Sequence, residues 1–293
     1  GSLISSGLNR TGQLGNGTAN DQATFSNVGA ITTWTHVSSG EFHTVAIRSD
    51  GSLWTWGFNQ NGQLGDATFV DKLEPLKIGS ASWIAIAAGK SHTLAIKKDG
   101  TLWAWGRNFF GQLGDGTVID RALPVQVGTA KNWTSVAAGT NHTIARRDDG
   151  TIWGWGDNSA GQVGIGTIIK TSTPTQIGTA TWVAIVAGES HSLAIRADGA
   201  LFGWGNNIKG QLGTTNPTFS LTPFQIGTQT TWAMVAAGSN HSLAIKNDGS
   251  LWSWGLNDDG QLGLGNYQLQ TIPTQVGDIK LWKTISAGQF HSL

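Results

Sequence analysis

A repeat of about fifty residues constrains the fold of this chain more than any other feature of its sequence. The motif G-x-N-x-x-G-Q-[LV]-G occurs six times along the 293 residues, at intervals of 49 or 50 residues. Its asparagines are Asn9, Asn59, Asn108, Asn158, Asn207 and Asn257. A period of this length is typical of propeller blades and solenoid units, in which each repeat is one supersecondary unit.

A second motif recurs with the same period and carries the tryptophans. It reads W-x-x-[VI]-x-[AS]-G-x-x-H-[ST] and also occurs six times, and the segment D-G-x-[LI]-[WF]-x-W-G follows it in five complete copies. These slots account for all 15 tryptophans of the chain. Because tryptophan buries a large apolar surface, a strictly periodic set of this kind predicts core side chains rather than a ligand site.

Each repeat predicts four short strands. Val45–Ile47 and Leu53–Trp56 are apolar runs on either side of an Asp-Gly turn, a strand around Val37 precedes them, and one around Leu76–Ile78 follows the long loop. No segment has a sustained helical apolar period. The chain is therefore predicted to be all-β, a single closed β-propeller domain of six four-stranded blades over residues 1–293.

The two ends of the chain predict how the ring closes. The opening residues match the segment 51–59 of the next repeat, with Ile4 and Ser6 in place of two tryptophans, and the closing residues 287–293 match the start of a hairpin. We expect Leu3–Gly7 to pair beside the strand that ends near Leu293. This pairing would complete a sixth blade and remove its exposed strand edges.

These motifs resemble the regulator of chromosome condensation repeat family over essentially all 293 residues. The resemblance implies a β-propeller; the best-known members have seven blades, whereas six are counted here. Relatives act as guanine-nucleotide exchange factors that bind chromatin, as a plant ultraviolet photoreceptor and as an inhibitor of β-lactamases. The photoreceptor's Gly-Trp-Arg-His-Thr copies have Trp and Arg where this chain has pairs such as Glu41-Phe42 and Lys90-Ser91, so that light chemistry is not expected here.

Charge and composition restrict the partner classes. With 18 Lys and Arg against 18 Asp and Glu, the chain lacks the basic excess with which nucleic-acid binders neutralise phosphates, and a nucleic-acid partner is not expected. It has no cysteine, which excludes disulfides and thiolate metal sites. No apolar run reaches the roughly 18 residues of a membrane span, and no signal peptide is evident. These features leave the compartment and the oligomeric state open.

The repeated histidines and cations favour structural roles. One histidine lies in each repeat, and since blades are spaced around a ring, equivalent positions are not expected to converge on a metal. We expect buried imidazoles bonded to backbone, and no catalytic, cofactor-binding or metal-binding residue. Five cations precede the Asp-Gly turns, each close to an aspartate, and predict a solvated rim. They are Arg48, Lys97, Arg146, Arg196 and Lys246.

The variable loop positions predict a binding surface. Phe109 and Phe110 form an aromatic pair in a slot that is mostly polar in the other repeats, and the long loops keep apolar tips that serve either inter-blade packing or a partner. Closure would bring Phe42 and Phe290 together, beside Glu41 and Gln289. Such a pair is either a binding hot spot or a seal for the closing blade. 

The sequence thus predicts a rigid scaffold that binds a protein partner through variable loops, without a cofactor. Two alternatives remain open. One is a hydrolase or lyase with its site at the axial mouth, which would need two or more acids or histidines within reach of one another. The other is a structural module of a larger surface or virion assembly.

Overall fold

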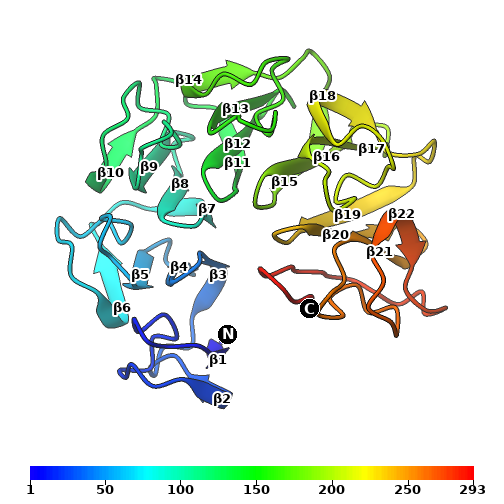
Figure 1. Ribbon diagram of the computed structural model, residues 1–293. Helices are drawn as coiled ribbons and strands as arrows, with labels where there is room; N and C mark the ends of the chain where they lie inside the picture. The colour runs from blue at the N-terminus through cyan, green and yellow to red at the C-terminus, as the bar shows by residue number, and fades with distance from the viewer.

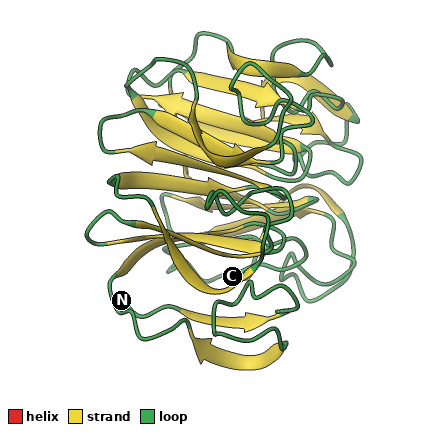
Figure 2. Ribbon diagram, turned by 90° about the vertical axis from the view of Figure 1, so that its left-hand side faces the viewer, coloured by secondary structure: helices red, strands yellow, loops and turns green.

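The fold is a ring of antiparallel sheets. The computed structural model describes residues 1–293 and contains 22 strands. Figure 1 shows the blades arranged around a central axis in chain order, and Figure 2 shows that strands and loops make up the whole molecule. The all-β propeller expected from the repeat is confirmed. No helical membrane span is present among these elements.

Five blades are complete four-stranded sheets, each with its strands in sequence order from the axis outward. Blade 1 comprises β3 (Trp34–Ser39), β4 (His43–Arg48), β5 (Leu53–Gly57) and β6 (Lys72–Ile78). Blade 2 comprises β7 (Trp83–Ala88), β8 (His92–Lys97), β9 (Leu102–Gly106) and β10 (Arg121–Gln126). Blade 3 comprises β11 (Trp133–Ala138), β12 (His142–Arg147), β13 (Ile152–Gly156) and β14 (Thr171–Gln176). Blade 4 comprises β15 (Trp182–Ala187), β16 (His191–Arg196), β17 (Leu201–Asn206) and β18 (Phe219–Gln225). Blade 5 comprises β19 (Trp232–Ala237), β20 (His241–Lys246), β21 (Leu251–Gly255) and β22 (Gln270–Gln275).

The sixth set of strands is divided between the two ends of the chain. At the N-terminal end, β1 (Ile4–Gly7) pairs with β2 (Gln22–Asn27) in a two-stranded sheet. At the C-terminal end, residues 282–293 form a short hairpin with an isolated bridge between Ala287 and Ser292. Together these segments supply the strands of a sixth blade, but as two half blades on either side of the open sector in Figure 1.

The predicted pairing of Leu3–Gly7 with the strand ending at Leu293 is absent from the structure. As a strand, β1 pairs only with β2, while Leu293 exchanges two backbone hydrogen bonds with Ser286 inside its own hairpin. No backbone hydrogen bond joins the two half blades.

The Asp-Gly turns differ from the expected two-residue form. In blade 1 the amide of Arg48 donates to the carbonyl of Ser52, so the connection has three residues, and only Gly51 has a positive φ, of 78°. The carboxylate of Asp50 accepts hydrogen bonds from the amide and the hydroxyl of Ser52. Three-residue hairpins commonly place a glycine at this left-handed position, which explains why glycine recurs there.

The hydrophobic core lies between blades rather than inside them. The face of blade 2 that is turned toward blade 3 presents aliphatic side chains such as Leu94 and Leu102. The facing side of blade 3 presents Trp133, Ala145 and Trp155. All five of these side chains are buried. Because each blade presents one aliphatic face and one face of Trp and Ala, successive blades interlock in the same way around the ring.

Candidate protein-binding face

The repeat histidines link neighbouring blades. In five of them the imidazole Nε2 lies 2.9–3.3 Å from a Thr or Ser hydroxyl of the following blade. The first such pair is His43 with Thr93, and the hydroxyl of Thr93 donates in turn to the carbonyl of Gln63, at 2.8 Å. Since that hydroxyl has one proton to give, His43 must donate its own Nε2–H to the hydroxyl oxygen. Burial was predicted correctly for these five histidines, but the partner is a side chain of the next blade rather than backbone; the sixth, His291, is exposed in the C-terminal hairpin.

These imidazoles are neutral. Burial lowers the pKa of His43, His142 and His241 to about 4, and that of His92 and His191 to about 3. For His92 and His191 the neighbouring histidines lower the pKa further. The histidines are occupied in inter-blade hydrogen bonds, and no group of three or more His, Asp or Glu gathers where it would hold a metal ion.

The acidic side chains of the Gly-x-x-His loops are paired. These loops lie where the first strand of each blade turns into the second, near the axis. The carboxylate of Glu41 forms an ion pair of 3.2 Å with Lys90 of the next loop, and that of Glu189 accepts a hydrogen bond of 3.4 Å from Asn240. A hydrolase or lyase site at the axial mouth would need two or more acids or histidines within reach of one another. Glu41 and Glu189 are instead each held by a side chain of the next loop.

Most of the cations before the Asp-Gly turns lie over aromatic rings rather than forming a solvated rim, while Arg196 also pairs with Asp198, as the charge pattern predicted. Lys97 Nζ lies 3.4 Å from the ring centre of Trp103, and Lys246 Nζ lies 3.4 Å from that of Trp252. In blade 3 the stacked cation is Arg147, 3.9 Å from the ring centre of Trp153, whereas Arg146, the residue predicted for the rim, donates to the carbonyl of Trp182 at 3.3 Å. An ammonium or guanidinium over an indole gains a cation–π interaction. For the stacked side chains of blades 2, 3 and 5 this interaction, rather than pairing with the nearby aspartate, determines the position.

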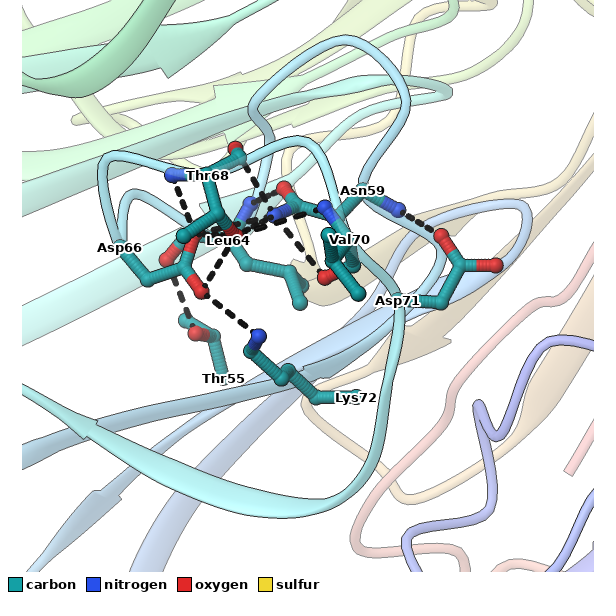
Figure 3. Close-up of polar contacts among 8 residues, drawn as sticks. All are labelled: Thr55, Asn59, Leu64, Asp66, Thr68, Val70, Asp71 and Lys72. Atoms are coloured by element: carbon teal, nitrogen blue, oxygen red, sulfur yellow. Dashed lines mark hydrogen bonds and ion pairs between the residues drawn. The ribbon is translucent and has the colours of Figure 1, made fainter.

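The long loops carry the variable apolar residues on a rigid frame. In blade 1 the buried side chain of Asn59 donates to Asp66 and to the carbonyls of Thr68 and Val70, and accepts from the amide of Leu64 (Figure 3). Figure 3 also shows Lys72 paired with Asp66, at 3.2 Å. A buried asparagine that satisfies several backbone groups makes the loop conformation unique.

The tips of these loops are exposed. They lie at the ends of the third strands, on the same face of the ring as the Gly-x-x-His loops, as the hydrogen bond from the amide of Phe58 to the carbonyl of Phe42 shows in blade 1. We call this side the loop face. Its exposed apolar tips are Phe69, Val70, Phe109, Val118, Ile119, Ile168, Ile169, Ile208, Phe219 and Tyr267, each at least half exposed.

The first candidate pair forms an aromatic projection on the loop face. The rings of Phe109 and Phe110 meet edge to face, with centres 5.0 Å apart, and Phe109 is 59% exposed. Lys170, from the loop of the next blade, lies 5.3 Å from the ring centre of Phe109 and donates to its carbonyl at 3.4 Å. Lys170 was missed at the sequence level, because it belongs to a different repeat and only the stacking of blades brings it here.

The second candidate group is divided by the open sector of the ring. Phe42 is 39% exposed and packs edge to face on Phe58, with Glu41 beside it. Phe290 is half exposed in the C-terminal hairpin, where the carbonyl of the adjacent Gln289 accepts from the amide of Ser239. All four residues lie on Gly-x-x-His loops of the loop face. Glu41 and Phe42 belong to blade 1, whereas Gln289 and Phe290 belong to the C-terminal hairpin, and no hydrogen bond joins the two pairs.

Comparison with known proteins identifies relatives of this arrangement. The family model described as the RCC1-like domain matches residues 2–293. The ultraviolet-B receptor UVR8 of Arabidopsis thaliana is 34% identical over 80 residues, which are 27% of this chain and 18% of the receptor. The matched segment therefore spans less than a fifth of that relative's length.

Solved structures reproduce the fold over almost the whole chain. Prp20p of Saccharomyces cerevisiae superposes with a TM-score of 0.88 and 24% identity, covering 99% of this chain and 77% of that one. Human WBSCR16 superposes with a TM-score of 0.70 and 20% identity, covering 99% of this chain and 97% of that one. At these identities the similarity concerns the fold.

Proposed function

Because this chain belongs to the RCC1-like domain family, we propose that it is a protein-binding module whose loop face carries the contact residues. The observation that supports the proposal most directly is the contrast between an invariant loop frame and its exposed, variable apolar tips. Exposed apolar groups held on rigid loops lose little conformational entropy on binding. The yeast relative Prp20p has been crystallised with Kap60 and studied for binding to Gsp1p and histones, which are protein partners.

The pair Phe109–Phe110 is the anchor that we assign to this face. Aromatic side chains surrounded by polar groups are typical of interface hot spots, and here Lys170 and the loop backbone provide the polar surroundings. Blade 3 has Ser159 and Ala160 in the same slot. The double substitution Phe109→Ser with Phe110→Ala therefore changes the surface while keeping residues that this loop frame already accepts.

The experiment compares this loop-face variant with a matched variant on the opposite face. Asp148→Lys, next to an Asp-Gly turn, introduces the residue that blade 2 has at position 98. Partners of the full chain are enriched by affinity capture and quantified by mass spectrometry for all three proteins. We expect a defined protein partner to bind the wild type and Asp148→Lys, and to bind the loop-face variant at least tenfold less tightly, since hot-spot side chains are each worth about 2 kcal/mol or more. 

Two outcomes contradict the proposal. One is a partner retained by the loop-face variant and lost on Asp148→Lys. The other is the absence of any saturable protein partner together with reproducible turnover of a small molecule.

A second contact region is proposed at Phe42 and Phe290, with Glu41 and Gln289. It requires the two half blades to come together as a closed sixth blade, and it rests on the shared position of these residues on the loop face. Phe42→Ser with Phe290→Asn introduces the residue types of the other repeats. Loss of binding with an unchanged melting temperature supports a contact role, whereas loss of stability with binding intact shows that the two rings only seal the blade.

A further inference from the structure

A groove between blades 3 and 4 reaches the aromatic core of blade 4. It is lined by the segment after β14, by Arg196 beside an Asp-Gly turn, and by Gly164 and Ile165 of the long loop of blade 3, and it has a volume of about 410 Å³. Its wall is mostly apolar, and one charged residue faces it. The residues that matter for its chemistry are Ile165, Ile177, Trp182, Arg196, Phe202 and Pro223.

The equivalent groove between β2 and blade 1 is shallower. It has a volume of about 310 Å³ and is lined by the counterparts of the outer residues, such as Asn16, Ile31 and Pro75. The deeper residues Trp34 and Trp54, which correspond to Trp182 and Phe202, do not line it. The additional depth at blade 4 therefore coincides with a change of residue in the floor of the groove.

The change replaces both a Trp and the Ser or Thr that accepts the hydrogen bond of its indole. In the four other complete blades, the indole N–H of this Trp donates to a Ser or Thr hydroxyl two residues earlier, as Trp252 does to Ser250 at 3.0 Å. Blade 4 has Ala200 and Phe202 instead, so that both partners of the bond are absent. The ring of Phe202 meets Trp182 edge to face, with centres 5.1 Å apart, and it is smaller than the indole that the other blades have at this position.

The cation at this groove is also arranged differently. In blades 2, 3 and 5 the equivalent Lys or Arg lies over two indoles. Arg196 lies over Phe202 alone, at 4.7 Å, and its Nε and Nη2 bond to Asp198. Asp198 offsets much of the charge of Arg196, but Nη1 has no hydrogen-bond partner and is free to donate to a ligand at this aromatic-lined opening.

We propose that this groove binds a small aromatic carboxylate. The flat ring lies against Trp182 and Phe202, where the other blades have a second indole, and the carboxylate accepts a hydrogen bond from Nη1 of Arg196. An aromatic ring suits the site because edge-to-face contacts with the two aromatic side chains are available. An anion suits it because Arg196 is the one charged residue in its lining.

The test uses indole-3-acetate as the probe and the full chain as the receptor. Binding is followed by ligand-observed NMR titration, with tryptamine as a probe of the same ring and opposite charge. We expect a dissociation constant on the order of 1 mM for indole-3-acetate, as for a ligand of this size. Tryptamine and the Arg196→Gln protein with indole-3-acetate should each bind at least tenfold more weakly.

Two double variants exchange the groove between blades. Ala200→Ser with Phe202→Trp restores the residues of the other blades and should abolish binding. Ser250→Ala with Trp252→Phe should open a second groove in blade 5, beside Lys246, and raise the stoichiometry to two. This gain of binding tests the proposal even if the first variant were to fold poorly. Undiminished binding to the restored variant, equal binding of tryptamine, or no saturable binding to the wild type overturns the proposal.

Discussion

At the scale of single residues, the motif Gly-x-x-His-[Ser/Thr] describes one joint between blades. The imidazole of His92 packs on Gly89, where a Cβ atom would overlap the ring, and this close approach is why the position is glycine. In five of the six copies the residue after the histidine supplies the hydroxyl that the preceding blade's histidine and Gln carbonyl share, as Thr143 does for His92 and Gln112. Packing and hydrogen bonding between blades thus explain why the motif recurs along the chain.

Thr93→Val tests this joint. The substitution keeps the shape of the side chain but leaves the Nε2–H of His43 and the carbonyl of Gln63 buried without their partner. Since each unsatisfied buried group costs about 1–3 kcal/mol, we expect the free energy of unfolding in urea to fall by about 2–4 kcal/mol. Thr93→Ser, which keeps the hydroxyl as Ser192 does in blade 4, should lose less than about 1 kcal/mol. Equal losses for the two variants would show that the hydroxyl is not what matters.

At the scale of the element, the long loop of each blade is held by its asparagine. In blade 2 the side chain of Asn108 accepts from the amide of Leu113, at 3.0 Å, and donates to Asp115 and to the carbonyls of Thr117 and Ile119. One side chain therefore holds a loop of more than ten residues, and the exposed tip residues between those contacts are free to vary. This division explains how loop diversity and a regular fold coexist.

Asn108→Ala should release this loop while the blade persists. The amide of Leu113 and two or more carbonyls lose their partner, so we expect the free energy of unfolding to fall by about 2–3 kcal/mol. Amide hydrogen exchange at Leu113 should accelerate strongly, while the strands of blade 2 keep their protection. Phe109→Ser, in the same loop but exposed, serves as the control and should change neither quantity appreciably. Unchanged exchange at Leu113 in Asn108→Ala would refute the assigned role of the asparagine.

At the scale of the whole molecule, the blades are joined by repeated interfaces, each with an aliphatic face against a face of Trp and Ala. The buried neutral histidines lie at these same interfaces. Because the interfaces between blades are equivalent, a condition that weakens one of them weakens all of them and lowers the stability of the whole ring. Acid is such a condition, because the five histidines of the complete blades share a lowered pKa.

Stability should fall steeply between pH 6.5 and about 4. In this window the unfolded chain protonates these histidines, while the folded protein, with pKa values of about 3 to 4, does not. Protons therefore favour the unfolded state, by at most about 1.4 kcal/mol per pH unit for each histidine, and the five contributions act in the same direction. Urea midpoints measured at pH 7, 6 and 5 check the slope. His92→Gln should reduce it by about one fifth, and a flat profile would contradict the buried neutral state.

The sequence alone determined the parts that depend on local periodicity. The spacing of the repeats predicted the all-β propeller, the four strands of the five complete blades and the burial of their histidines, because each follows from the pattern of side chains within one repeat. Phe109 and Phe110 could be recognised as a surface feature because their slot is polar in most other repeats. The exposed loop tips could be located, although their exposure could not be distinguished from inter-blade packing.

The tertiary structure alone decided the contacts between repeats. Lys170 on Phe109, the stacking of Lys97 and Arg147 on tryptophans, and the hydroxyl partners of the histidines depend on how strands are registered and how one blade is rotated against the next. The open state of the sixth blade was also undecidable from the repeat pattern, which shows that two segments match but not whether their backbones meet. Geometry between units about fifty residues apart is set by packing, and packing is not encoded in the period of a sequence.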